Sequence, residues 1–243
     1  MNDFEREISK FIDIELIRKH GVVFNDIVEM EYKRIGFLPS DVFGKKVIDI
    51  GAHVGIFSLL CQALGARSII SIEANPKTFA DLFRNLSQCP SVKAIINKAV
   101  FDGCIAEINI IDKDTGSTVT NSELGSFQGI QCISLDHILE EQNSNEIVMK
   151  MDIEGAEYTV LPACSKKSLR KCRTIFLETH PLDNEGNKVP GKRAEFIKEY
   201  LQLIGFKIVH QDYVWVNSFQ NGICVSSTPI INFEFLKFER VQE

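Results

Sequence analysis

Four polar side chains stand at or just after the ends of apolar runs, and they are the residues of this sequence best suited to chemistry. Asp49 and Glu73 lie at the ends of two such runs, and Asp152 and His180 follow two more. In a parallel sheet the carboxyl ends of the strands share one edge, where ligands bind. A carboxylate there can accept hydrogen bonds from ribose hydroxyls, and a carboxylate or an imidazole can remove a proton from an acceptor. The pattern therefore predicts a nucleotide-like cofactor and acid–base chemistry at one edge.

The turn from Gly51 to Gly55 narrows the cofactor class. A dinucleotide fingerprint requires G-x-G-x-x-G, but His53 and Ile56 occupy the places of its second and third glycines. The observed Asp-x-Gly-x-x-x-Gly pattern suits an amino-acid tail with a single ribose better than a diphosphate. Glu73 follows about 20 residues later, where a carboxylate binds ribose hydroxyls. We expect the glycines because a Cβ would collide with a ligand close to the backbone.

Strands and helices that alternate along the chain are expected to position these residues. Apolar runs and their punctuation predict strands at 47–50, 68–72, 92–96, 105–111, 146–151 and 174–177. They predict helices at 54–64 and 193–204, and a further helix that begins at Pro76, with Asn75 as its cap, and stops before Pro90. Asn221-Gly222 predicts a hairpin that joins strands at 207–219 and 223–226. The expected fold is α/β, with a doubly wound, mostly parallel seven-stranded sheet and a C-terminal antiparallel hairpin.

Two helical patterns precede the cofactor strand, at 4–20 and 26–35. They predict an N-terminal helical extension over residues 1–43, before a Rossmann-like domain over 44–243. Two polar, glycine-containing segments, at 112–129 and 182–192, are predicted to be loops. Together with the extension, these loops are expected to shape the site of the acceptor.

Composition limits the partners. The chain has 243 residues, 44% of them apolar, and a formal net charge of −6. This balance makes nucleic acid an unlikely partner, and the one basic cluster, at 166–173, is interpreted as a solvated connection. The first residues lack the pattern of a signal peptide, and no apolar stretch is long enough to span a bilayer. We therefore expect a cytoplasmic protein with no membrane partner.

The cysteines predict neither a disulfide framework nor a thiolate zinc site. Their number is seven, which is odd, and the sequence contains no C-x-x-C pair. Buried thiols that act as small apolar groups are the expected role. No ligand spacing calls for a metal, although the carboxylates and His180 could meet in the fold, so no metal residue is predicted.

Six strings occur in a fixed order between residues 47 and 181: VIDIGAHVGIFSLL, IEANP, NKAV, SLDHIL, VMKMDIEGAEYTVL and LETHP. Together they resemble the FkbM-type family of S-adenosylmethionine-dependent methyltransferases, which have a class I Rossmann-like fold. The DIEGAE block at 152–157 is the most specific part. The resemblance implies O-methyl transfer, often to a hydroxyl of a sugar, glycan or secondary metabolite, and therefore a small-molecule or carbohydrate acceptor.

The resemblance also implies roles for individual residues. The turn would approach the methionine part of the cofactor, Glu73 would hold the ribose, and Asp152 would stand beside the sulfonium and the acceptor. The full set of implied cofactor contacts is Asp49, Gly51, Ala52, His53, Gly55, Glu73, Asn97, Ala99 and Asp152. Asn97 and Ala99 would lie on the adenine side. Asp152, Glu154 and His180 are the candidates for the base that takes the acceptor's proton.

Several alternatives remain open at this point. An NAD-linked oxidoreductase would keep the fold, and a non-catalytic cofactor-binding module would keep the site; RNA is a further candidate acceptor. Asp49 could be a purely structural carboxylate, and His180 a structural histidine. Lys150 could pair with Asp152 or Glu154, or face solvent. The acceptor's identity and the oligomeric state do not follow from the sequence.

Overall fold

The computed structural model describes residues 35–113, 116–120, 127–180, 194–216, 219–220, 223–224 and 230–241. The helices predicted at 4–20 and 26–35, apart from residue 35, and the loop predicted at 182–192 lie outside these ranges.

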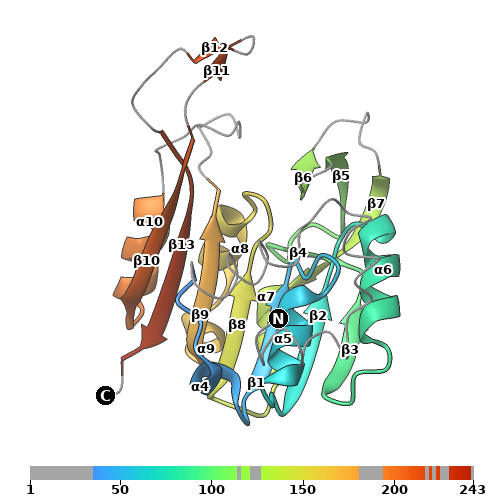
Figure 1. Cartoon of the computed structure of the whole chain (residues 1–243), viewed down its shortest axis with the longest axis vertical. Coiled ribbons are helices and arrows are strands. Elements are labelled where there is room, and N and C mark those ends of the chain that lie inside the picture. The colour runs from blue at the N-terminus through green and yellow to red at the C-terminus, as the bar shows by residue number, and fades with distance from the viewer. Residues whose placement is uncertain are drawn as a thin grey trace.

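A seven-stranded sheet forms the centre of the molecule, in the order β10-β13-β9-β8-β1-β2-β3 (Figure 1). Its strands are β1 (Lys46–Ile50), β2 (Ser68–Ile72), β3 (Val92–Ile96), β8 (Ile147–Met151), β9 (Cys172–Thr179), β10 (Phe206–Val216) and β13 (Ile230–Arg240). β9, β8, β1, β2 and β3 pair in parallel, whereas β13 is antiparallel to both β9 and β10. The predicted fold class is confirmed: the sheet is mostly parallel, with antiparallel strands at its C-terminal end.

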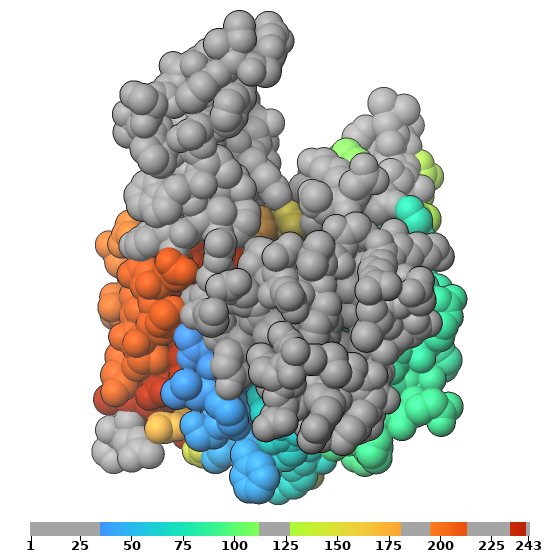
Figure 2. All heavy atoms as spheres, viewed as in Figure 1, coloured from blue at the N-terminus to red at the C-terminus, as the bar shows by residue number. Residues whose placement is uncertain are grey.

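Helices cover both faces of this sheet. The helices are α4 (Pro39–Val42), α5 (Ile56–Ala63), α6 (Pro76–Leu86), α7 (Leu135–Glu140), α8 (Glu157–Ala163), α9 (Lys166–Leu169) and α10 (Ala194–Leu203). Residues of α4, α5 and α6 pack into one apolar cluster, and residues of α7, α8, α9 and α10 pack into another. Side chains alternate along a strand, so Val47 enters the first cluster while Ile48 and Ile50 enter the second. In Figure 2, α10 in orange and α6 with β3 in green form opposite flanks of the molecule.

The start of α6 agrees with its sequence pattern. The side chain of Asn75 accepts hydrogen bonds from the backbone N–H groups of Lys77 and Thr78, and Pro76 takes the first helical position. Asn75 thereby satisfies backbone donors that the first turn leaves without partners. Because α6 follows β2 directly, this cap also determines the path of the chain just after Glu73.

A second sheet stands beyond the carboxyl end of the main one (Figure 1). Its order is β4-β7-β5-β6, with β4 (Ala99–Phe101), β5 (Glu107–Lys113), β6 (Gly116–Thr120) and β7 (Phe127–Ser134). The prediction of a loop over 112–129 is therefore wrong for β6 and for the start of β7. The segment is polar because this small sheet encloses only a small apolar cluster, of which Ile108, Ile110 and Ile130 are buried members.

The C-terminal hairpin differs from its prediction. Asn221-Gly222 does lie between two short paired strands, β11 (Phe219–Gln220) and β12 (Ile223–Cys224). The long strand β10, however, pairs with β13, and not with residues 223–226. β13 is buried on both faces through Phe235, Leu236 and Phe238, so its apolar burial determines the pairing.

The residues just before the predicted domain start pack into its core. Phe37 is 1% exposed, and its ring makes edge contacts with the rings of Phe57 and Phe176 at centroid distances of 5.4 Å. Lys237 of β13 forms a buried ion pair with Asp41 at 2.9 Å. Residues 35–42 thus contribute to the core, and the extent of the helical extension that precedes them stays a prediction.

Residues of the basic cluster at 166–173 donate hydrogen bonds to backbone carbonyls at the C-terminal ends of α7 and α10. Lys171 Nζ donates to the backbone carbonyls of Leu139, Glu140 and Gln142, and Arg170 donates to that of Ile204. The cluster therefore has a structural role in addition to its contact with solvent. Within the described part of the chain, no helix is long and apolar enough to cross a membrane.

Candidate active site

The four strand-end residues come together because their strands are neighbours. β9, β8, β1 and β2 lie side by side in the sheet, and Ile50, Met151 and Ile72 are in register. Backbone bonds continue this register past the strand ends, since the N–H of Asp152 donates to the carbonyl of Ile50 at 3.0 Å. This strand order explains why the four residues lie at one edge of the sheet.

The turn after β1 meets the loop after β8. Gly51 has a φ of +74°, and a Cβ there would lie 1.7 Å from the carbonyl oxygen of Asp152. Gly55 has a φ of +94°, and its Cβ would lie 2.9 Å from a methyl carbon of Leu82 on α6. Close protein contacts therefore require both glycines, and the ligand contact expected from sequence stays a prediction. The consequence is that the turn lies directly against Asp152.

Asp49 anchors the turn from beneath. Its side chain is 0% exposed, and Ser58 of α5 donates a hydrogen bond of 2.6 Å to its Oδ2. Because the Ser58 hydroxyl has only one proton, it accepts from the hydroxyl of Ser71, 2.7 Å away. Burial raises the pKa of Asp49, against the lowering effect of Lys150 on the neighbouring strand. These contacts agree with the structural role considered for Asp49.

Glu73 joins the turn to the end of β2. Its Oε2 accepts from the backbone N–H of His53 at 2.9 Å, and its Oε1 accepts from that of Asn75 at 2.8 Å. Burial raises the pKa of Glu73 to about 7, although both hydrogen bonds lower it. His53 has a φ of +51°, a conformation that costs energy for a residue with a Cβ. The carboxylate is thus fixed in orientation before any ligand binds.

Asn97 and Ala99 occupy the loop and strand beside Glu73. The amide nitrogen of Asn97 donates to the backbone carbonyls of Glu73 at 2.8 Å and Ala74 at 3.1 Å. Ala99 is buried in the small cluster of the second sheet. Asn97 therefore shapes the path of the chain after β2, and adenine contacts from these two positions stay predictions.

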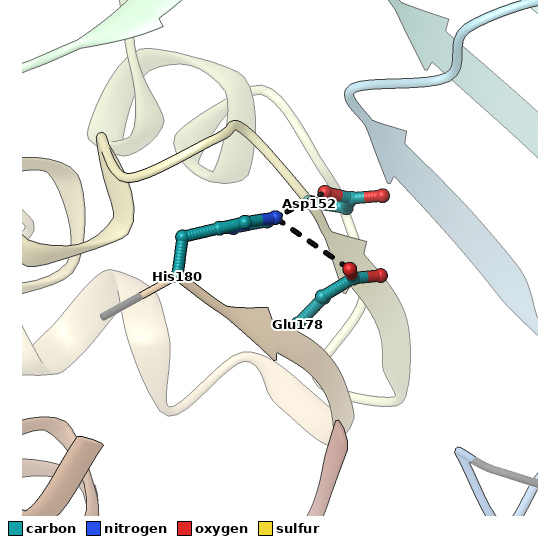
Figure 3. A group of neighbouring side chains, drawn as sticks. All are labelled: Asp152, Glu178 and His180. Carbon is teal, nitrogen blue, oxygen red and sulfur yellow. Dashed lines mark ion pairs between the residues drawn. The ribbon is translucent and has the colours of Figure 1, made fainter. Parts of the chain in front are cut away.

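Five titratable residues meet where β8 and β9 end, and we call them the strand-end cluster: Asp152, Glu154, Glu157, Glu178 and His180. The Nε2 atom of His180 lies 3.9 Å from a carboxylate oxygen of Asp152, 3.6 Å from one of Glu154 and 3.5 Å from one of Glu178. Figure 3 shows its imidazole pointing between Asp152 and Glu178. One histidine thus faces three carboxylates through a single nitrogen.

The other nitrogen of His180 contacts the fourth carboxylate. Nδ1 lies 3.1 Å from Oε1 of Glu157, which is 0% exposed and also accepts from the N–H of Ile153. Burial alone lowers the pKa of His180, but Glu157 and Glu178 raise it well above its ordinary value. Glu157 therefore determines the orientation of the ring.

The carboxylates of the cluster differ in their charge preference. Burial opposes the ionisation of Asp152, but Lys150 at 3.4 Å and His180 lower its pKa. For Glu178, burial and the nearby Asp152 raise the pKa to about 7. The proposed pair between Lys150 and Asp152 is confirmed, and the site keeps one carboxylate ionised beside another that titrates near neutral pH.

Sequence reasoning missed Glu157 and Glu178 as members of the site. Glu178 and His180 are two residues apart in an extended segment, so their side chains lie on the same face, and this spacing could have identified Glu178. Glu157 lies within the DIEGAE string, but its complete burial depends on packing that the string does not encode. Ser58 and Ser71, polar residues inside apolar runs, carried a similar signal for Asp49.

Comparison with known families agrees with this arrangement. The sequence profile described as the methyltransferase FkbM domain matches residues 49–208, more than half of the chain. The chain belongs to the FkbM methyltransferase family. The predictions of family, of a Rossmann-like methyltransferase and of S-adenosylmethionine as its cofactor are thereby confirmed. The FkbM assignment opposes the oxidoreductase alternative. No curated protein sequence matches the chain significantly.

Solved structures resemble this FkbM family member in fold. The Thermoplasma acidophilum protein 1320 is 13% identical, with a TM-score of 0.50 over 100% of this chain and 97% of its own. TYW2 of M. jannaschii, in complex with AdoMet, is 15% identical, with a TM-score of 0.44 over 87% and 75%. TrmK of M. capricolum, in complex with S-adenosyl-homocysteine, is 8% identical, with a TM-score of 0.48 over 86% and 68%. At these identities the similarity concerns the fold alone.

Proposed function

We propose that this FkbM family member transfers the methyl group of S-adenosylmethionine to a hydroxyl oxygen of a sugar, glycan or secondary metabolite. The observation that carries the proposal is the position of the strand-end cluster against the glycine turn. The turn is the expected place of the methionine part, and Asp152 contacts it through the close approach at Gly51. A hydroxyl that enters beside the methyl group would therefore lie among carboxylates.

The residues present fit the cofactor. Two backbone N–H groups orient the carboxylate of Glu73, and each of its oxygens keeps a lone pair that can accept from a ribose hydroxyl. The negative charge of Asp152 suits the positively charged sulfonium. In this proposal Gly51, Ala52, His53 and Gly55 surround the methionine part, and Asn97 and Ala99 border the adenine.

The reaction requires positioning and removal of one proton. The bond from sulfur to the methyl carbon breaks as the bond from that carbon to the acceptor oxygen forms, so alignment supplies much of the rate. An alcohol has a high pKa, and a base in contact with it helps as charge develops. The carboxylates around His180 favour its imidazolium form, which cannot accept a proton. We therefore assign the proton to Asp152 or Glu154, with His180 as the group that orients them.

The test combines binding with product analysis. Calorimetry with S-adenosyl-homocysteine should show micromolar-scale binding, and Glu73→Gln should weaken it. Incubation of the full chain with methyl-labelled cofactor and separate pools of sugars, glycans, hydroxylated metabolites and tRNA should label a hydroxyl-bearing small molecule or glycan. Asp152→Asn and Glu154→Gln should lower the rate at least tenfold, whereas Glu141→Gln, on the exposed end of α7, should not.

Each outcome separates the alternatives. Label that appears in tRNA, or on a nitrogen or a carboxylate, would overturn the proposed acceptor and keep the methyltransferase. Cofactor binding without product in any pool or in a cell extract would favour the non-catalytic module. Absence of cofactor binding by the unmodified chain would remove the proposal altogether.

A further inference from the structure

We propose that Asp152, Glu178 and His180 bind one divalent metal ion. The three residues come from the ends of two adjacent strands, β8 and β9, and each offers one ligand atom. All three ligand atoms lie within 4.8 Å of one another. Figure 3 shows that the imidazole and the two carboxylates point toward a common region.

The two separations from His180 match those between the ligands of a single ion. Two donor atoms that each lie about 2.1 Å from a small divalent cation are roughly 3 to 4.2 Å apart, depending on the angle between them. The Nε2 atom of His180 is 3.9 Å from the oxygen of Asp152 and 3.5 Å from that of Glu178. These distances exceed those of a good direct hydrogen bond, and they leave room for an ion between the groups.

A buried carboxylate behind the imidazole gives independent support. A metal-binding histidine usually donates the N–H of its second nitrogen to a carboxylate, which fixes the ring and its tautomer. Glu157 holds this position at 3.1 Å from Nδ1 and is completely buried. Its Oε2 has no hydrogen-bond partner within the described part of the chain. A buried carboxylate of this kind requires positive charge nearby. An ion on Nε2 would supply that charge through the ring, in place of the imidazolium proton.

The charge around the histidine also calls for a cation. Four carboxylates, those of Asp152, Glu154, Glu157 and Glu178, have an oxygen within 3.9 Å of a ring nitrogen of His180. Lys150 contributes one fixed positive charge, at 3.4 Å from Asp152. A divalent ion that replaces the proton on Nε2 would add one further positive charge and so reduce this excess.

The ligand set suggests the class of metal. Two carboxylates favour hard cations, and one imidazole favours first-row transition metals over Mg²⁺ and Ca²⁺. Mn²⁺ suits both ligand types and is the probe we choose. With three protein ligands, the remaining positions of the ion can be taken by water or by an oxygen of the acceptor.

The role of this ion in the reaction rests on the proposed function. An acceptor hydroxyl bound to the ion would lose its proton more easily, and the proton would pass to the nearby Glu154. The methyl group would then move from sulfur to that oxygen. The prediction of no metal residue from sequence therefore gives way to a specific site in this proposal.

The binding test uses the full chain without cofactor. Titration with Mn²⁺, followed by the loss of the free-ion signal in electron paramagnetic resonance, should show one ion per chain. Glu178→Gln and His180→Gln should each weaken binding at least tenfold, as should Glu157→Gln through the orientation of the ring. Circular dichroism melting confirms that each variant is folded, and Glu178→Gln, which is partly exposed, keeps the test valid if a buried variant fails to fold.

A matched control is available at the residue that follows α7. Glu141 pairs its carboxylate with Nε2 of His137 at 3.3 Å, but both side chains are more than half exposed. Glu141→Gln should leave Mn²⁺ binding unchanged. Absence of saturable binding by the folded chain, or equal binding by the wild type and Glu178→Gln, would overturn the proposal.

Two further measurements separate this inference from the proposed function. If Mn²⁺ binds as expected and no methylated product forms, the metal site stands and the proposed function fails. If product forms equally well in EDTA and Mn²⁺ does not bind, the function stands and the metal site is refuted.

Discussion

The affinity for the cofactor should depend on pH through Glu73. Burial raises the pKa of this carboxyl to about 7 in the free protein. Ribose hydroxyls donate to the ionised carboxylate, so binding of S-adenosyl-homocysteine selects the ionised form and lowers its pKa. With a pKa near 7, about a tenth of the molecules are ionised at pH 6 and about nine tenths at pH 8. The dissociation constant should therefore be roughly tenfold larger at pH 6 than at pH 8, a difference in binding free energy of about 1.4 kcal/mol.

Isothermal titration calorimetry at pH 6, 7 and 8 measures this difference directly. Repetition at pH 7 in buffers with different ionisation heats should show release of about half a proton on binding. In Glu73→Gln the affinity should be weaker and almost independent of pH. Glu178 also titrates near pH 7, so Glu178→Gln is the matched control and should keep the wild-type pH dependence. A flat wild-type profile, or a slope that survives Glu73→Gln and disappears in Glu178→Gln, would refute the assignment.

The raised pKa of Glu73 also predicts how the stability of the protein depends on pH. The direction of this dependence is opposite to that of a carboxylate whose pKa is lowered by folding. An unfolded chain releases the proton of Glu73 near pH 4.5, whereas the native protein releases it near 7. The native state therefore binds more protons between these values, and Glu73 contributes stability below pH 4.5 that is lost as pH rises to 7. In urea unfolding, the free energy of unfolding of the wild type should accordingly fall relative to that of Glu73→Gln as the pH rises through this window.

Three substitutions test the packing that supports the site. Gly51→Ala should lower the free energy of unfolding by about 1–2 kcal/mol because of the left-handed backbone, and by a further 1–3 kcal/mol, roughly, because of the clash with Asp152. Gly44 has a similar backbone conformation but open space around it, so Gly44→Ala should show only the backbone contribution. Phe37→Ala should cost about 3–5 kcal/mol, and Phe43→Ala, which is 72% exposed, less than about 0.5 kcal/mol. Asp41→Ala leaves the buried Lys237 with only the more distant Glu239, at 4.0 Å, as a carboxylate partner, and should cost about 3–5 kcal/mol. Urea unfolding measures all of these, and a Gly51→Ala loss no larger than that of Gly44→Ala would contradict the packing account.

Local sequence patterns were sufficient to predict the parallel part of the fold. Apolar runs that end in glycine or a carboxylate identify β1, β2 and β8, because a strand buried on both faces has few other compositions. The order of these strands then brings Asp49, Glu73 and Asp152 to one edge. This is why residues far apart in the chain could be assigned to one site without coordinates.

The place of β13, the burial of Glu157 and the second sheet depend on contacts that no local sequence pattern contains. β13 carries buried charged residues such as Lys237, whose partner Asp41 is 196 positions earlier, so its pattern does not resemble that of a core strand. Glu157 resembles an ordinary charged residue at a helix start, and only tertiary packing buries it against His180. The second sheet is polar for a similar reason, because it covers little apolar surface.

The position of β13 has a consequence for the synthesis of the protein. This strand follows both β9 and β10 in the sequence but lies between them in the sheet, and it pairs with both. Until residue 240 has left the ribosome, β9 has one open edge and β10 has no partner in the main sheet. An open strand edge is a template for pairing with other chains. The interval between the synthesis of β9 and the emergence of β13 is therefore the period in which these strand edges are open to pairing with other chains.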